Sequence, residues 1–174
     1  MSVLLAVDPG VRYPAGALFV SGVLQKASRV KIPKGIGPKT PVLERCRAIS
    51  FAIAEWAGVT PDVLVSEFPQ IYPADKSKGD PNYLTPLAAM GGVLAGFYPN
   101  ARVLSPLPKE WTGNIPKNED GDPLDSPRGR RVWERLSEVE RTRVVPSHDA
   151  VDAVGLGLYG LGRFERRRVY ETGL

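Results

Sequence analysis

The sequence predicts one α/β domain built on a mixed five-stranded sheet with helices on both faces. Two apolar segments joined by a Ser-Gly turn near the start predict a hairpin, and strand-like and helix-like segments alternate after it. The chain has 174 residues, of which 43% are hydrophobic and 24% are charged. These values fit a single globular domain over residues 1–174, with a basic tail from about residue 163, and exclude a disordered or fibrous protein.

The first half of the sheet is predicted to be antiparallel. Residues 2–7 form a short apolar run that stops at a DPG turn, which is typical of a buried strand followed by a turn. Residues 15–20 and 23–30 flank the Ser-Gly turn and predict a hairpin. Asp8, the first residue of the DPG turn, is therefore expected at the end of a strand.

A helix and a parallel strand are predicted next. Thr40 is the expected N-cap and Pro41 the first helical residue, and apolar residues then recur every three or four positions until Gly58. Residues 62–66, with the sequence DVLVS, are too short and too apolar for a helix and predict a buried parallel strand. Because Glu67 follows directly, a second carboxylate is expected at a strand end.

The following segments predict one more strand between loops and helices. Residues 68–83 are rich in proline and charge and lack periodicity, which indicates an exposed loop. A second helix is expected to begin at Thr85, and residues 101–104 predict a fifth strand. Residues 105–127 are expected to form a loop, followed by a short helix over residues 128–136.

The last helix is predicted over residues 148–163, with Ser147 as its N-cap. It carries Asp149 and Asp152, which are three residues apart and therefore leave the same face of its first turn. Each of the glycines that follow costs roughly 1 kcal/mol of helix propensity relative to alanine. The helix must therefore be held by close packing against the sheet.

Four carboxylates are expected to meet if that helix packs beside the first and fourth strands: Asp8, Glu67, Asp149 and Asp152. Four negative charges in one place need protons or cations to neutralise them, and two divalent ions balance the sum. Oxygen ligands favour Mg²⁺ or Mn²⁺, and two such ions would stabilise both the attacking water and the leaving 3′-oxygen of a phosphodiester. Taken singly, each acid also has an ordinary structural explanation in a turn, at a solvated strand end or at a helix start.

Composition narrows the chemistry further. A single cysteine, Cys46, and a single histidine, His148, exclude an intrachain disulfide and the usual zinc sites. Carboxylates must therefore carry any catalysis. No apolar stretch reaches the roughly 18–20 residues needed to span a bilayer, and the first residues lack a basic leader. A cytoplasmic protein without a membrane partner is expected.

The charge distribution favours a polyanionic partner. Basic residues outnumber acidic ones by 23 to 19, and the sequence pI is about 9.3. Residues 26–47 hold seven basic residues and one acid, Glu44, and four more arginines lie within residues 163–168. A nucleic acid would match this pattern, whereas a solvated surface with a frayed tail is the ordinary alternative.

Three segments resemble, in order and spacing, the acidic motifs of the RuvC family of Holliday junction resolvases: LLAVDPGVR, VLVSEFPQ and SHDAVDAVGLGLYG. The order of strands and helices also resembles the RNase H-like fold. The resemblance covers nearly the whole chain and implies a homodimer that binds a four-way DNA junction and nicks two strands symmetrically. It implies water as the nucleophile and a catalytic tetrad that binds two Mg²⁺ or Mn²⁺ ions: Asp8, Glu67, Asp149 and Asp152.

The sequence departs from the family pattern in two places, which are the metal ligand at Asp149 and the stretch between Glu67 and the final helix. Some family members have histidine where Asp149 stands, and His148 is its neighbour. A one-residue offset on a helix turns a side chain by about 100°, so Asp149 is favoured as the ligand. The free variation between Glu67 and the final helix is similar to that of a phage-type branch, which implies a bacterial cell or a phage-infected bacterium as the setting.

The same resemblance implies DNA contacts. In the family an aromatic residue soon after the second acid wedges into the opened junction, and Phe68 and Tyr72 are the candidates here, with Tyr72 favoured. The segment KEWTGNIPK resembles the DNA-binding loop, so phosphate contacts are expected from Lys109 and Lys117, and also from Arg12. Trp111 within that segment fits a core anchor equally well.

Three other functions compete with a junction resolvase. A broader nuclease that cuts flaps, branches or hybrids would use the same tetrad, because the acids specify the reaction and not the substrate shape. An actin-like ATPase begins similarly but needs a second domain. A non-catalytic junction-binding protein would not need the acids, which repel DNA unless they hold metal.

Overall fold

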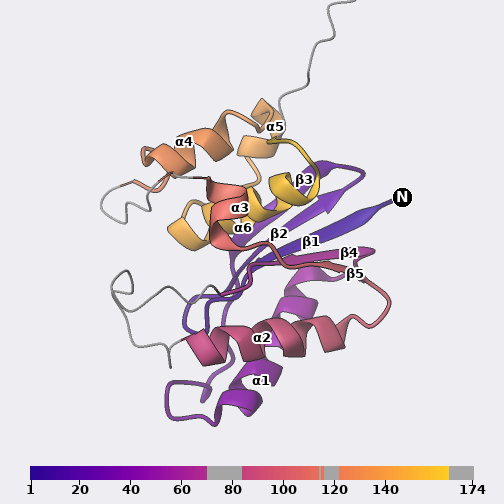
Figure 1. Ribbon diagram of the computed structural model, residues 1–174, viewed down its shortest axis with the longest axis vertical. Helices are drawn as coiled ribbons and strands as arrows, with labels where there is room; N and C mark the ends of the chain where they lie inside the picture. Colours follow the sequence, from indigo (N-terminus) through magenta and orange to yellow (C-terminus); the bar gives the residue numbers. More distant parts are fainter. Residues whose placement is uncertain (70–83, 114, 116–121, 165–174) are drawn as a thin grey trace, which may run out of the picture.

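The predicted fold class is confirmed by the computed structural model, which describes residues 1–69, 84–113, 115 and 122–164. One mixed five-stranded sheet with the order β3-β2-β1-β4-β5 forms its centre, and helices cover both faces (Figure 1). None of the helices in these ranges is long and apolar enough to cross a membrane.

The antiparallel half of the sheet matches the sequence prediction. It consists of β1 (Val3–Asp8), β2 (Ala15–Val20) and β3 (Val23–Arg29). The Ser-Gly turn between β2 and β3 places Ser21 at φ 50° and Gly22 at φ 79°, the left-handed conformation in which glycine costs least. The hairpin therefore depends on local turn chemistry that the sequence displays directly.

The parallel half aligns two acidic residues. It consists of β4 (Val63–Ser66) and β5 (Arg102–Leu104), and β4 pairs with β1 in parallel so that Val7 lies opposite Ser66. Because parallel strands end at the same edge of a sheet, the acid at the end of β1 and the acid directly after β4 leave the sheet side by side. These acids are Asp8 and Glu67.

Two helices, α1 (Val42–Ala57) and α2 (Leu84–Phe97), cover one face of the sheet (Figure 1). The expected N-cap of α1 was wrong by one residue. Pro41 holds that position, and the Thr40 hydroxyl instead accepts a hydrogen bond from the Gly37 amide at 3.0 Å. The predicted end is confirmed, since Gly58 caps α1 at φ 71°.

The other face is covered by α3 (Pro108–Thr112), α4 (Pro127–Trp133), α5 (Glu138–Arg141) and α6 (His148–Gly160). The expectation of a continuous loop over residues 105–127 was wrong, because that range contains α3. A proline at the first position and a Glu110 side chain that caps the Leu107 amide at 2.6 Å start this helix, which is too short to show an apolar period. The helix expected over residues 128–136 is the shorter α4, which ends at Trp133, and the separate α5 follows it.

Close packing of α6 against its surroundings explains its glycines. A Cβ added at Gly157 would lie 2.1 Å from the Phe19 ring, and one added at Gly155 would lie 2.5 Å from the Trp111 ring. Ser147 caps the helix as predicted, by accepting a hydrogen bond from the Ala150 amide at 3.1 Å. The helix is thus held by contacts that only a missing side chain permits, and its first turn points to the edge where β1 and β4 end.

Candidate active site

Three of the four predicted acids line one cavity at the carboxyl ends of β1 and β4. Asp8, Glu67 and Asp149 share this cavity of about 550 Å³ with Arg12 and Tyr13. Asp8 arrives from β1, Glu67 follows β4, and Asp149 lies in the first turn of α6. The sheet register and the N-terminus of α6 therefore bring these three carboxylates to one place.

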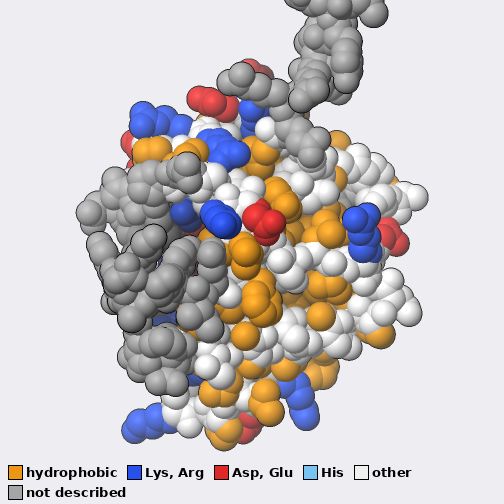
Figure 2. Space-filling view, viewed as in Figure 1, with side chains coloured by type: hydrophobic (Ala, Val, Ile, Leu, Met, Phe, Trp, Pro, Cys, Tyr) orange, Lys and Arg blue, Asp and Glu red, His pale blue; other side chains and the backbone are white. Residues whose placement is uncertain are grey.

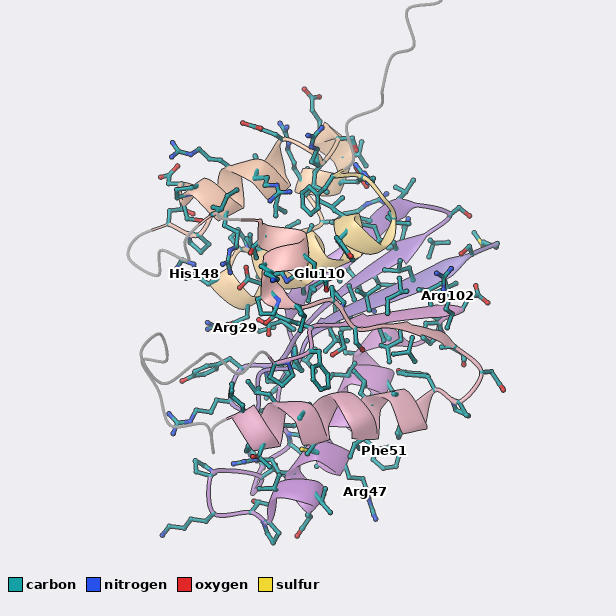
Figure 3. The ribbon with its side chains drawn as sticks, in the orientation of Figure 1. Arg29, Arg47, Phe51, Arg102, Glu110 and His148 are labelled. Carbon is teal, nitrogen blue, oxygen red and sulfur yellow. The ribbon has the colours of Figure 1, made fainter. Side chains whose placement is uncertain are left out.

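An arginine from the sheet edge holds the acid of α6. Arg29 Nε donates to Asp149 Oδ2 at 2.6 Å, and its guanidinium lies 4.8 Å from the centroid of the Tyr13 ring. Across the sheet, Arg29 is the register partner of Ala15, which in turn faces Asp8. Asp8, Ala15 and Arg29 thus lie in one row across the three strands, which explains how an arginine on the edge strand reaches the site. Figure 3 shows Arg29 and His148 at this end of the sheet and Arg102 at the opposite end.

The fourth acid, Asp152, is not among the residues that line this cavity. It is held by a different arginine, because Arg128 Nη1 from α4 lies 3.3 Å from each of its carboxylate oxygens. Both side chains are largely buried, at 10% exposed for Asp152 and 15% for Arg128. The two acids of α6 therefore share a helix face but take separate partners.

Trp111 connects Glu67 to the arginine that holds Asp152. Its indole Nε1 donates to Glu67 Oε2 at 2.6 Å, and the Arg128 guanidinium lies 5.3 Å from its ring centroid. The side chain is 2% exposed, so it anchors the core and touches a predicted catalytic acid at the same time. Glu67, Trp111, Arg128 and Asp152 form one continuous set of contacts behind the cavity.

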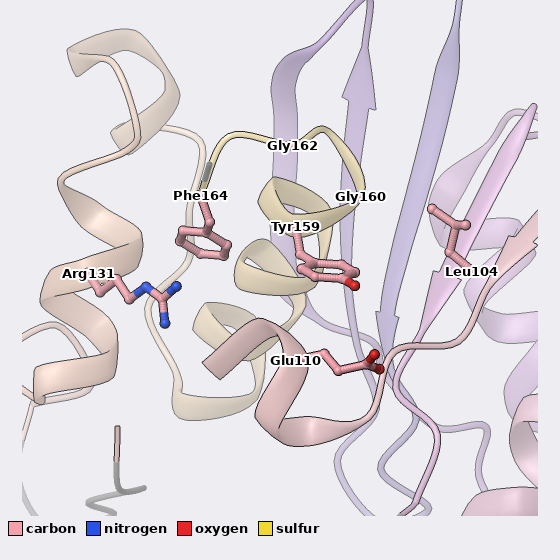
Figure 4. A pocket seen from close by; sticks show the side chains of 7 residues that line it. All are labelled: Leu104, Glu110, Arg131, Tyr159, Gly160, Gly162 and Phe164. Atoms are coloured by element: carbon pink, nitrogen blue, oxygen red, sulfur yellow. The ribbon is translucent and has the colours of Figure 1, made fainter. Parts of the chain in front are cut away.

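The short helix α3 is fixed from its other side. Glu110 lines a second cavity of about 490 Å³, together with Leu104, Tyr159 and Phe164 (Figure 4). Arg131 of α4 stacks over the Phe164 ring at 4.4 Å and donates to the Thr112 carbonyl at 2.7 Å. These contacts hold the helix that carries Trp111, and so hold the indole against Glu67.

The donor set suits a hard cation, although the side chains do not enclose one. Carboxylate oxygens are the ligands that Mg²⁺ and Mn²⁺ prefer, and three carboxylates line the cavity. Across the ranges that the structure describes, no group of three or more His, Cys, Asp or Glu side chains is arranged to hold a metal ion. Asp149 and Asp152 are neutralised by arginines, and a divalent ion would have to take over part of that role.

The predicted DNA contacts have different positions. Arg12 is exposed and lines the acidic cavity, Phe68 is 49% exposed, and Lys109 is exposed on α3. Phe68 is thus available to a partner rather than buried in the core. Tyr72 and Lys117 lie outside the described residues.

Sequence reasoning missed the partners of the acids. Arg29 was visible only as one member of the basic segment, and nothing in the sequence marked Arg128. Trp111 was left open between the DNA-binding loop and a core anchor, and its contact to Glu67 was not predicted. A long-range pair such as Arg29 with Asp149, which are 120 residues apart, depends on the sheet order and leaves no local pattern. His148 is half-buried and does not line the acidic cavity.

The arrangement of the sheet, with an acid at the end of each central strand and a helix that brings a third, defines an RNase H-like α/β protein. No protein-family model and no curated protein matches the sequence. Solved structures do match. Thermus thermophilus RuvC in complex with a Holliday junction substrate aligns with a TM-score of 0.57 and 18% identity over 91% of each chain.

Two further solved structures have the same fold. A second structure of Thermus thermophilus RuvC aligns with a TM-score of 0.54 and 15% identity, over 92% of this chain and 97% of the other. The yeast mitochondrial Holliday junction resolvase Ydc2 aligns with a TM-score of 0.52 and 12% identity, over 90% of this chain and 76% of the other. The chain therefore shares the RNase H-like fold of these resolvases across most of its length.

Proposed function

We propose that this protein is a metal-dependent endonuclease that resolves four-way DNA junctions by paired nicking. The observation that carries the proposal is the cavity shared by Asp8, Glu67 and Asp149 at the carboxyl ends of the central strands. The likeness to solved structures described as Holliday junction resolvases, one of them in complex with a junction, supports the choice of substrate.

The proposed reaction is hydrolysis of a phosphodiester. Water attacks the phosphorus, the bond from phosphorus to the 3′-oxygen breaks, and the products carry a 5′-phosphate and a 3′-hydroxyl. Divalent ions bound at the site would supply positive charge that lowers the pKa of the attacking water and stabilises the leaving oxygen. Asp8, Glu67 and Asp149 are the residues to hold these ions, and Asp152 joins them if its carboxylate turns away from Arg128.

The residues around the cavity suit the approach of DNA. Arg12 and Tyr13 line the acidic cavity beside the three acids, so a guanidinium and a phenol are placed to bind phosphates next to the scissile one. Phe68 follows Glu67 directly and is 49% exposed, which suits stacking on an unpaired base. The protein would thus bind the backbone and the opened base pairs from one edge of the sheet.

The proposed assembly is a homodimer, because two symmetric nicks need two sites related by the symmetry of the junction. Hydrophobic side chains gather over the half of the molecule that α1 and α2 occupy (Figure 2). Phe51 of α1 is 54% exposed there and meets Phe97 of α2 edge to face at 4.8 Å. This surface supports a contact through α1 and α2, whereas Trp56 and Met90 are engaged within the chain.

The test is a nicking assay on a synthetic four-way junction with Mg²⁺ or Mn²⁺, beside duplex and flap DNA of the same sequence. Paired nicks in the junction are expected for the natural protein. They are expected to fall by roughly 100-fold or more in Asp8→Asn, because the amide would hold a divalent ion less well than the carboxylate and the ion is what stabilises the transition state. Asp62→Asn is the matched control, since Asp62 accepts from the Val3 amide at the far end of β1.

Each other outcome rejects a part of the proposal. Equal cutting of flaps and junctions would identify a broader branched-DNA nuclease. Tight junction binding without cleavage under either metal would identify a structural DNA-binding protein. Full activity in Asp8→Asn would remove the acidic cavity as the site of chemistry.

A further inference from the structure

A buried arginine that has no charge partner among the described residues lies beside the acidic cavity. Arg45 in the first turn of α1 is 8% exposed, and its Nε has no hydrogen-bond partner within the described ranges. Its Nη1 makes one long contact, 3.4 Å to the Gly37 carbonyl. No carboxylate in the described part of the chain forms an ion pair with it. A buried guanidinium in this state is costly, and a bound anion would offset that cost.

Arg45 lines a cavity that could hold such an anion. The cavity has a volume of about 400 Å³, and Arg12 and Tyr13 also line it. Its other walls are backbone at Gly37 and apolar side chains, which are Val11, Ile32, Ile36 and Pro38. Two guanidiniums and a phenol suit the oxygens of a phosphate, while the apolar walls suit a sugar.

The position of Arg45 on α1 adds to the positive potential. The N-cap of α1 is Pro41, whose side chain makes no capping hydrogen bond, and Glu44, the acid of the first turn, is exposed, so the partial positive charge of the helix N-terminus is only partly neutralised. A helix N-terminus favours anions, and the guanidinium of Arg45 supplies the full charge beside it. Together they make the cavity attractive to a phosphodiester.

This cavity and the acidic cavity are neighbours along one segment of the chain. Val11, Arg12 and Tyr13 line both of them. A DNA strand whose scissile phosphate lies at Asp8, Glu67 and Asp149 can therefore continue across this segment into the second cavity. We infer that the cavity between the Val11–Tyr13 segment and the start of α1 binds a backbone phosphate of the same DNA strand, through Arg45 and Arg12.

This inference rests on the proposed function and adds a second phosphate site to it. The site takes any phosphodiester, so it contributes affinity and position rather than sequence recognition. It also gives a reason for an unpaired arginine inside the fold, which no structural contact in the described residues provides. The proposed phosphate site does not require Arg47, the exposed arginine of α1.

The test measures junction binding by fluorescence anisotropy in EDTA, so that no divalent metal is present. Arg45→Met keeps the length of the side chain and removes its charge. Its dissociation constant is expected to rise on the order of tenfold, and the slope of log affinity against log salt is expected to fall by about one. Arg45→Lys is expected to recover part of the loss. Arg102→Met, at the far end of the sheet, is the matched control and is expected to bind as the natural protein does.

Thermal unfolding separates this role from a structural one. Removing an unpaired buried charge is expected to leave the melting temperature of Arg45→Met unchanged or raised. Unchanged affinity and salt slope in Arg45→Met would overturn the inference, as would a loss of binding that only follows a loss of folding. If the natural protein fails to bind the junction both in EDTA and with a divalent metal, the proposed function falls and this site with it. If it binds only with metal, the same comparison of Arg45→Met is made in that buffer. Normal binding by both proteins rejects the site alone.

Discussion

The two ends of α6 each carry an acid–arginine pair, and the pairs differ in how firmly they are built. At the start of the helix, Arg29 contacts Asp149 at 2.6 Å, with the side chains 49% and 18% exposed. Just past the end, Arg163 contacts Glu140 at 2.7 Å, with the side chains 28% and 4% exposed. The distances are alike, so the surroundings decide what each pair does.

The pair past the end of α6 is a fully bonded structural contact. Glu140 Oε1 also accepts from the Leu24 amide at 2.9 Å, and Oε2 accepts from the Ser137 amide and hydroxyl, both at 2.9 Å. Burial acts to raise the pKa of Glu140, but hydrogen bonds from Arg163, Leu24 and Ser137 outweigh it and lower the pKa to about 2. This carboxylate joins β3, α5 and the chain after α6.

The pair at the start of α6 is open and belongs to the cavity. Asp149 faces a cavity that it shares with Asp8 and Glu67, and its arginine is half exposed. An exposed pair contributes little to stability, typically below about 1 kcal/mol. One end of α6 therefore holds the fold, whereas at the other end Asp149 lies in a cavity where a cation could replace Arg29 as its partner.

Acid should therefore destabilise the protein through the Glu140 end. The pKa of Glu140 is about 2 in the folded protein and 4.5 in the unfolded chain, so the unfolded chain binds the proton more readily. The contribution is fully present above about pH 4.5 and is lost as the pH falls toward 2. A difference of about 2.5 units corresponds to roughly 3 kcal/mol of unfolding free energy, measurable by urea denaturation across this range.

Glu140→Gln isolates this effect from that of the other acids. The variant should lose roughly 3 kcal/mol at neutral pH and should show a shallower acid dependence than the natural protein. Glu138→Gln, an exposed position on the same short helix, should match the natural protein in both respects. An acid dependence that is the same in all three proteins would contradict the assignment to Glu140.

Trp111→Phe tests whether the hydrogen bond from Trp111 to Glu67 supports the acidic cavity at the start of α6. Phenylalanine keeps most of the buried ring but cannot donate the hydrogen bond to Glu67 Oε2. Loss of such a supporting contact typically costs about 10–100-fold in metal affinity or activity, and we expect roughly tenfold in the single-turnover nicking rate. The half-saturating Mn²⁺ concentration should rise as well, which a purely structural role would not produce.

Trp56→Phe is the matched control for this substitution. It also removes an indole hydrogen bond, in this case 3.0 Å to the Ser28 hydroxyl, on the other face of the sheet. The nicking rate and the metal response of this variant should stay at the natural level. Equal losses in both variants would show that the indole of Trp111 acts through stability and not through Glu67.

Features that depend on local sequence patterns could be predicted, whereas features without such a pattern could not. The strands, the hairpin turn and the acids at the strand ends were predictable, because a short apolar run and a DPG or Ser-Gly turn are local patterns. The helix α3 was not, since five residues are too few to show a helical period.

The site was predictable only in part for a similar reason. The sequence predicted that Asp8, Glu67, Asp149 and Asp152 meet, and all of them except Asp152 line one cavity. The arginines that hold Asp149 and Asp152 come from elements that are far apart in the sequence, and their choice depends on side-chain reach across the packed fold. The metal ligation of all four acids stays a prediction.

Arg29→Gln is expected to have the smallest effect, and it tests most directly whether a divalent cation replaces Arg29 as the partner of Asp149. If a divalent cation replaces Arg29 as the partner of Asp149, removing the guanidinium removes a competitor. Metal affinity measured without DNA should then rise, by only about two- to fivefold, because the pair is half exposed and worth less than about 1 kcal/mol. Calorimetric titration with Mn²⁺ measures this, with Arg102→Gln as the control. A weaker affinity in Arg29→Gln would instead mean that Arg29 orients the Asp149 carboxylate for metal rather than competing with it, and the open end of α6 would then be a preformed site.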